Sequence, residues 1–76
     1  MALKNAPVAV GARTEAVRDL AQRIQAEYAE MPGLSVTLAQ AQRLWAIDRH
    51  TCETVFDRLV ARGVVRMTMK KQFVRA

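Results

Sequence analysis

The strongest constraint on the fold is a run of apolar residues in the C-terminal half of the chain. They recur at positions i, i+3, i+4, i+7 and i+8, a spacing that places every member on one face of an α-helix. The members are Cys52, Val55, Phe56, Leu59 and Val60. Gly63 then supplies the residue type that most often follows a helix in the left-handed conformation. The pattern predicts a helix over about 49–62 with one buried face.

The opposite face of this helix is polar. At about 100° per residue, the residues pointing away from the apolar stripe can be assigned directly. They are His50, Thr54, Asp57, Arg58 and Ala61, with Thr51 and Glu53 on the flanks. We expect these side chains to face outward.

A second helix is predicted directly before the helix at 49–62. The tetrapeptide 37–40 has the sequence of a capping box, in which the side chains of Thr37 and Gln40 each accept a hydrogen bond from the other residue's backbone N–H. The helix can continue only to about Ala46, because Asp48 is a favourable N-cap for the next helix. About three residues then separate the two helices, so we expect them to cross steeply.

The N-terminal part of the chain predicts a third helical segment, over about 14–30. Its apolar residues share one face and are Val17, Leu20, Ala21, Ile24, Tyr28 and Met31. Thr14 is a plausible N-cap and Pro32-Gly33 stops the helix. Residues 1–13 show neither a helical nor a strand period and are predicted to form a flexible N-terminal arm. Residues 34–36 are long enough only for a short strand.

The C-terminal segment predicts a closing hairpin. Two alternating, β-branched or aromatic runs, 64–69 and 72–75, are separated by Lys70-Lys71. Since this pair lacks the glycine or asparagine of a two-residue turn, we expect a wider loop with a cationic tip. Residues 64–75 are called the wing below.

The positive charge of the chain is concentrated at the same end. Twelve Lys and Arg against seven Asp and Glu give a net charge of +5. Residues 1–57 have a balance of −1, whereas residues 58–76 carry six basic side chains and no acidic one, a balance of +6. A basic block of this kind favours a polyanionic partner, because each cation placed on a phosphate releases condensed counterions.

Residues 35–76 resemble the winged helix-turn-helix family of bacterial DNA-binding proteins. The resemblance lies in a capped helix, a polar turn, a helix ending in Leu-Val-Ala-Arg-Gly-Val-Val at 59–65, and a basic two-stranded wing. It implies an α+β, mainly α fold: three helices, a small antiparallel sheet and a C-terminal wing, in one domain over 14–76.

The resemblance also implies that the chain binds double-stranded DNA as a transcriptional regulator. In this family the third helix lies in the major groove and the wing reaches the backbone or the minor groove. The implied contacts on the helix are Arg49, His50, Thr51, Thr54 and Arg58. Those on the wing are Arg66, Lys70 and Lys71.

The carboxylates on the outer helix face leave an alternative open. Glu53 and Asp57 are repelled by phosphate unless they accept from a cytosine amino group. The alternative is a protein-interaction adaptor that presents Glu53, Asp57 and Arg58 to a protein partner.

Other classes of function are not expected. The chain has no Ser-His-acid order, no Gly-rich phosphate loop and no paired carboxylates with a plausible cleft, so we expect neither an enzyme nor a bound cofactor. Asp48, His50 and Cys52 do not converge as metal ligands if Cys52 faces the core. Trp45 and Tyr28 are predicted to be core residues and not platforms for bases.

Size and cysteine content suggest the remaining properties. A domain of 76 residues buries only part of its surface, so a homodimer meeting through the first helix or the arm is expected. One cysteine excludes an intramolecular disulfide framework and favours a cytoplasmic protein. No window approaches the length of a membrane span, so no membrane partner is expected.

Overall fold

Three helices and a three-stranded antiparallel sheet make up the protein. The computed structural model describes the backbone of residues 2–76 and the side chains of residues 14–76. The elements, in chain order, are α1 (Ala2–Glu30), β1 (Ser35–Thr37), α2 (Leu38–Leu44), α3 (Arg49–Ala61), β2 (Val65–Met67) and β3 (Gln72–Arg75). The mainly helical α+β architecture predicted from the sequence is confirmed, and it is compatible with a winged helix-turn-helix arrangement.

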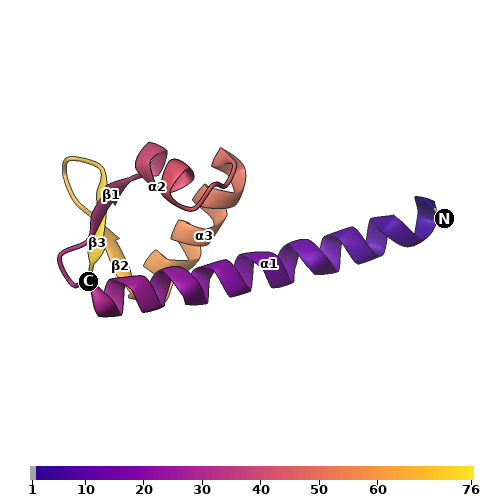
Figure 1. Ribbon diagram of the computed structural model, residues 1–76, viewed down its shortest axis with the longest axis horizontal. Helices are drawn as coiled ribbons and strands as arrows, with labels where there is room; N and C mark the ends of the chain where they lie inside the picture. Colours follow the sequence, from indigo (N-terminus) through magenta and orange to yellow (C-terminus); the bar gives the residue numbers. More distant parts are fainter. Residues whose placement is uncertain (1) are drawn as a thin grey trace.

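The sheet closes the molecule at the C-terminal end of α1 (Figure 1). Its strand order is β1-β3-β2, so the last strand lies between the other two. Val36 pairs with Phe73 in one ladder, and Met67 pairs with Phe73 in the other. The short strand after α1 therefore holds the wing against the helices, which positions the wing beside α2 and α3.

The core lies between α1, α3 and the inner face of the sheet. Its buried residues come from every element and are Ala21, Ile24, Tyr28, Val36, Ala41, Cys52, Val55, Phe56, Leu59, Val65 and Phe73. The ring centroids of Phe56 and Phe73 are 4.4 Å apart, which joins α3 to β3. Tyr28 donates a 2.7 Å hydrogen bond to the Phe73 carbonyl and so joins α1 to the same strand. The prediction that Tyr28 is a core residue is confirmed.

Local capping explains where the two central helices begin. The capping box is present, with Thr37 N donating to Gln40 Oε1 at 2.9 Å and Gln40 N to Thr37 Oγ1 at 3.2 Å. Asp48 caps α3 and accepts from Thr51 N at 3.0 Å, as its residue type predicts.

Both helices end in a left-handed residue. Gly63, with φ 75°, follows α3, and the amide of Val64 donates to the Leu59 carbonyl at 2.9 Å. Ala46, with φ 53°, occupies the same place after α2, and Ile47 N donates to the Gln42 carbonyl at 3.0 Å. These bonds satisfy carbonyls that the helix ends would otherwise leave unpaired. The Ile47–Gln42 bond also sets the sharp turn between α2 and α3.

The first helix begins at Ala2 and not near Thr14, so the predicted N-cap at Thr14 is wrong. Alanine is the strongest helix former, and alanines at 2, 6, 9 and 12 offset the breaking tendency of Pro7 and Gly11. Residue 1 and the side chains of residues 2–13 lie outside the described part of the chain, so the flexibility expected for residues 1–13 stays a prediction.

Two members of the predicted apolar stripes are exposed. Met31 is 47% exposed and Val60 is 43% exposed. Met31 follows the last turn of α1, beyond the edge of the core, and Val60 lies on the flank of α3 where no element covers it. The other stripe residues of α3 are buried as predicted.

Candidate nucleic-acid interface

The predicted contact residues of α3 lie on two different sides of the helix. His50, Thr51, Thr54 and Arg58 face the side on which α1 lies, and with Thr14 and Val17 they line a hollow of about 340 Å³. We call this the α1–α3 hollow. The structure therefore brings four of the five predicted helix residues together, although one wall of their surroundings is α1 and not open solvent.

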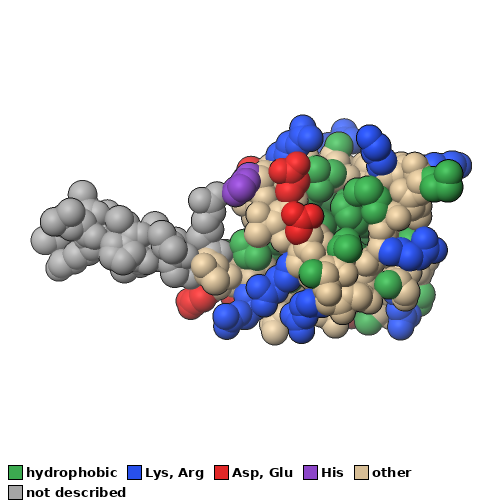
Figure 2. Space-filling view, turned by 180° about the vertical axis from the view of Figure 1, so that it is seen from behind, with side chains coloured by type: hydrophobic (Ala, Val, Ile, Leu, Met, Phe, Trp, Pro, Cys, Tyr) green, Lys and Arg blue, Asp and Glu red, His purple; other side chains and the backbone are tan. Residues whose placement is uncertain are grey.

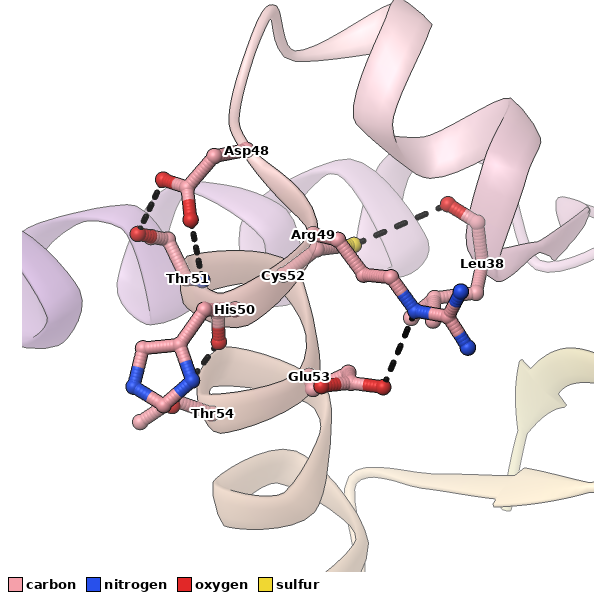
Figure 3. Close-up of polar contacts among 8 residues, drawn as sticks. All are labelled: Leu38, Asp48, Arg49, His50, Thr51, Cys52, Glu53 and Thr54. Atoms are coloured by element: carbon pink, nitrogen blue, oxygen red, sulfur yellow. Dashed lines mark hydrogen bonds and ion pairs between the residues drawn. The ribbon is translucent and has the colours of Figure 1, made fainter.

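Intrahelical hydrogen bonds fix two of these side chains (Figure 3). Thr51 Oγ1 donates to Asp48 Oδ1 at 2.5 Å, and Thr54 Oγ1 donates to the His50 carbonyl at 2.9 Å. Each hydroxyl proton is thereby engaged, so each hydroxyl can offer only its remaining lone pair to a ligand. Thr54 is exposed and Thr51 is half-buried, so Thr54 is the more accessible acceptor.

Arg58 is less accessible than an ordinary surface arginine. The residue is half-buried, and its Nε atom is shielded from solvent with no hydrogen-bond partner. A buried donor without an acceptor costs free energy, and a ligand that offers an acceptor to Nε would remove this cost. Arg58 lines the α1–α3 hollow, where a ligand can offer it an acceptor.

Arg49 points to the other side of α3, toward the wing (Figure 3). A second hollow, of about 450 Å³, combines the beginning of α2 with Arg49 and with two wing residues. We call it the α2–wing hollow. Its lining residues are Thr37, Leu38, Ala39, Gln42, Arg49, Met67 and Lys71. Arg49 and Lys71, distant in the sequence, are both cations at this one hollow.

Two further wing cations lie at a third hollow, of about 480 Å³, called the wing hollow. Arg66 and Lys70 line it together with Met67, Thr68, Met69 and Gln72. All three predicted wing residues, Arg66, Lys70 and Lys71, are exposed. The wing loop spans 68–71, so the expectation of a loop wider than two residues is confirmed.

Carboxylates lie between the two sides of α3. Glu53 Oε2 is 3.3 Å from Arg49 Nε, with the two side chains 46% and 75% exposed. Asp57 is one turn further along the helix and is exposed. Figure 2 shows acidic side chains beside a hydrophobic patch, with Lys and Arg side chains above and below them. The face is therefore mixed in charge and is basic only at its margins.

Cys52 belongs to the core, as predicted. Cys52 is fully buried, and its Sγ atom points toward α2, 3.7 Å from the Leu38 carbonyl oxygen (Figure 3). Burial raises the pKa of the thiol to about 11, and the charges of Glu53 and Asp48 act in the same direction. The side chain is a protonated, apolar core group at neutral pH.

Trp45 is half-buried and contacts both the core and α1. Its ring centroid is 6.1 Å from that of Phe56, and its Nε1 atom donates to Glu27 Oε2 at 2.6 Å. The indole N–H is therefore engaged within the protein, and the prediction that Trp45 packs inward holds in part.

Sequence reasoning missed three residues at these hollows, Gln42, Met67 and Met69. Gln42 lies outside the predicted contact helix, and the methionines were assigned only to the strands. The available signal was the position of Met69 directly before the two lysines. Among the described residues, no three His, Cys, Asp or Glu side chains are arranged to hold a metal ion. No described helix is both long enough and apolar enough to cross a membrane.

A comparison with protein-family models found no match to the chain. Searches of curated proteins and of solved structures found no match either.

Proposed function

We propose that the protein binds double-stranded DNA through α3 and the basic wing, and acts as a transcriptional regulator. The observation that supports this most is the convergence of Arg49 and Lys71 at the α2–wing hollow. With a cation on the helix and a cation on the wing at one hollow, α3 can contact a base edge while the wing contacts a phosphate of the same duplex.

The proposal assigns different roles to the two groups of residues. Lys70, Lys71 and Arg66 are exposed and flexible enough to contact phosphates, and Arg58 contributes a further phosphate contact from the α1–α3 hollow. Arg49, His50, Thr51 and Thr54 contact base edges. Because the Thr54 proton is engaged with the His50 carbonyl, Thr54 acts as an acceptor and favours the amino groups of cytosine or adenine.

The acidic residues limit the affinity of this face. Glu53 is partly neutralised by Arg49, but the pair must separate if Arg49 is to bind DNA. An exposed ion pair of this kind is worth about 0.2–1 kcal/mol, so a phosphate or a guanine can displace it. The Asp57 carboxylate is repelled by DNA phosphates, so the protein favours sites that offer Asp57 a cytosine amino group.

The test is the salt dependence of binding to a fluorescent random duplex of about 25 base pairs, which exceeds two helical turns. The wild-type protein should show a log–log slope of about −3 to −6, since each neutralised phosphate contributes about −0.9. Replacing Lys70 and Lys71 with alanine should make the slope shallower by about 2, because two phosphate contacts are lost.

Arg23→Ala is the matched control, because Arg23 is an exposed arginine of α1 that lines none of the three hollows. Its slope should equal that of the wild-type protein. An unchanged slope in the double variant would remove the wing from the interface. Absence of wild-type binding at low salt would reject DNA as the partner.

The alternative is a protein-interaction adaptor, and one observation favours it. Val60, expected in the core, is exposed beside Glu53 and Asp57 at helical spacing, so α3 carries an apolar residue next to two carboxylates. Arg58, the third residue expected on that surface, lies instead at the α1–α3 hollow. A Val60→Ser variant should bind DNA normally if the DNA proposal is right and should lose a protein partner if the adaptor proposal is right.

The proposal includes a cytoplasmic homodimer. A free, buried thiol suits a reducing compartment. A dimer would place two α3 helices on half-sites about 34–36 Å apart along one face of the duplex. Sedimentation should give a dimer at micromolar concentration, and a monomer throughout that range would exclude this part of the proposal.

A further inference from the structure

The tip of the wing is a rigid turn. Lys71 N donates to the Thr68 carbonyl at 2.9 Å, and Thr68 N donates to the Gln72 carbonyl at 2.8 Å. The Thr68 hydroxyl also accepts from Gln72 N at 3.2 Å. These three bonds form a four-residue turn, 68–71, whose last residue is left-handed, a common way of closing a hairpin. Residues 69 and 70 are therefore presented at a fixed apex.

The residues at this apex are poor choices for the turn itself. Turns of this type favour proline, aspartate or asparagine at the centre and glycine at the left-handed position. The chain instead has Met69, Lys70 and Lys71, and Lys71 adopts φ 60°. A non-glycine residue there costs about 1 kcal/mol or more. Such departures from local preference are concentrated at functional positions.

Met69 has no role in the stability of the domain. Its side chain is fully exposed at 102%, and Met67, two residues earlier on the same side of the hairpin, is 52% exposed. Lys70, Lys71 and Arg66 surround these methionines, and no acidic residue occurs in 64–76. The wing thus ends in an apolar side chain set among cations.

We infer that Met69 is a wedge that enters the minor groove and separates one base step, while Lys70 and Lys71 hold the flanking phosphates. The inference rests on the proposed function. Apolar side chains that unstack a base step bend the duplex by about 20–90°, and methionine is among the residues that do so. The rigid turn matters here, because a mobile tip would lose much of the binding energy to ordering.

DNA is the occupant that the geometry favours over a lipid surface. One methionine side chain buries too little apolar area to anchor a protein in a bilayer, where two hydrophobic signals are generally needed. A base step needs only one inserted side chain, and the lysines next to Met69 match the two phosphate chains that border the groove.

The experiment measures DNA bending by energy transfer between dyes at the two ends of a duplex of about 25 base pairs, at protein concentrations that saturate binding in anisotropy. The wild-type protein and Met69→Leu should bend the duplex, since both keep an apolar wedge. Met69→Ala should bind with an affinity within about tenfold of wild type and leave the duplex straight. Unstacking a base step costs a few kcal/mol, and burial of the methionine side chain gains about as much, so the variant loses both the gain and the cost.

Met31→Ala is the matched control, because Met31 is also an exposed methionine but follows α1, away from the wing. It should bend DNA as the wild type does. Bending by Met69→Ala equal to wild type, or a straight duplex with bound wild-type protein, would overturn the wedge while leaving DNA binding intact. No binding of wild-type protein to the duplex would overturn the proposed function together with the wedge.

Vesicles of phosphatidylserine provide the second arm of the experiment. The wild-type protein and Met69→Ala should bind these vesicles equally, through charge alone. Vesicle binding that depends on Met69, with a straight duplex, would show that the tip enters a membrane surface and would overturn the inference.

Discussion

Single residues in the left-handed conformation close both α2 and α3. Gly63 and Ala46 adopt φ 75° and 53° after their helices, and both positions satisfy a helix carbonyl through the following amide. Glycine adopts this conformation without strain, whereas alanine places a Cβ close to a carbonyl oxygen. The chain thus uses the favourable residue at one helix end and a strained one at the other.

This difference predicts substitutions of opposite sign. Gly63→Ala should lower the free energy of unfolding by about 1 kcal/mol, because no atom within 4 Å would hinder the new Cβ and only the backbone strain counts. Ala46→Gly should raise the free energy of unfolding by less than about 1 kcal/mol, since relief of strain is partly offset by unfolded-state entropy. Urea denaturation measures both. A stabilised Gly63→Ala variant would contradict the conformational account.

The buried thiol of Cys52 predicts how stability depends on pH. Its pKa is raised from 9.0 to about 11 in the folded protein, chiefly by burial, so the folded state keeps a proton that the unfolded chain releases. This stability is complete below about pH 9 and is lost as pH rises toward 11. Burial raises the pKa of Tyr28 from 10.0 to about 12, which extends the loss to higher pH.

Denaturant titrations at pH 7 to 11 test this dependence. The free energy of unfolding of the wild-type protein should fall above about pH 9 more steeply than that of Cys52→Ala, which lacks the thiol. Equal pH dependence in the two proteins would show that the thiol is not protected by the fold.

At the scale of elements, one hydrogen bond ties the first helix to the last strand. Tyr28 of α1 donates to the Phe73 carbonyl of β3 at 2.7 Å, inside the core. Phe73 also stacks near Phe56 of α3, with ring centroids 4.4 Å apart. The wing is therefore oriented from α1 as well as from β1, and its position relative to α3 depends on this contact.

Tyr28→Phe removes the hydroxyl and keeps the ring. The free energy of unfolding should fall by about 0.5–1.5 kcal/mol, the usual net value of one hydrogen bond. For a domain of this size, about 1 kcal/mol corresponds to a Tm lower by about 4–8 °C in thermal denaturation. Gln25→Ala, at an exposed position of the same helix, should leave Tm nearly unchanged. A Tm for Tyr28→Phe equal to wild type would mean that the bond does not stabilise the docking of α1.

The central helices could be predicted from local residues, whereas their surroundings could not. Thr37, Gln40, Asp48 and Gly63 act within one turn of the chain, so their residue types sufficed to place the helix ends. The N-terminal extension of α1 was missed because an alanine-rich segment has helical propensity without an apolar period. Val60 was misplaced because spacing defines the centre of a buried stripe better than its margins.

At the scale of the whole molecule, the predicted interface divides along α3. Helical spacing groups His50, Thr54 and Arg58 on one face of α3, but the sequence analysis gave Arg49 no separate side. Only the tertiary arrangement puts α1 beside the first group and the wing beside Arg49. The exposed methionine at the wing tip was likewise not recognised as a contact, because it was assigned to an alternating run and the sequence does not show where the strand ends. Whether these surfaces act together on one duplex is the central question.

The most direct measurement is a chemical-shift map of the isotope-labelled protein, recorded as a duplex of about 25 base pairs is added. The account predicts that the largest changes fall on Arg49, His50, Thr54 and the wing tip at 69–71, while the C-terminal end of α1 stays unperturbed. Changes centred on Glu53, Asp57 and Val60 without the wing, or no changes at all, would contradict DNA binding by α3 and the wing.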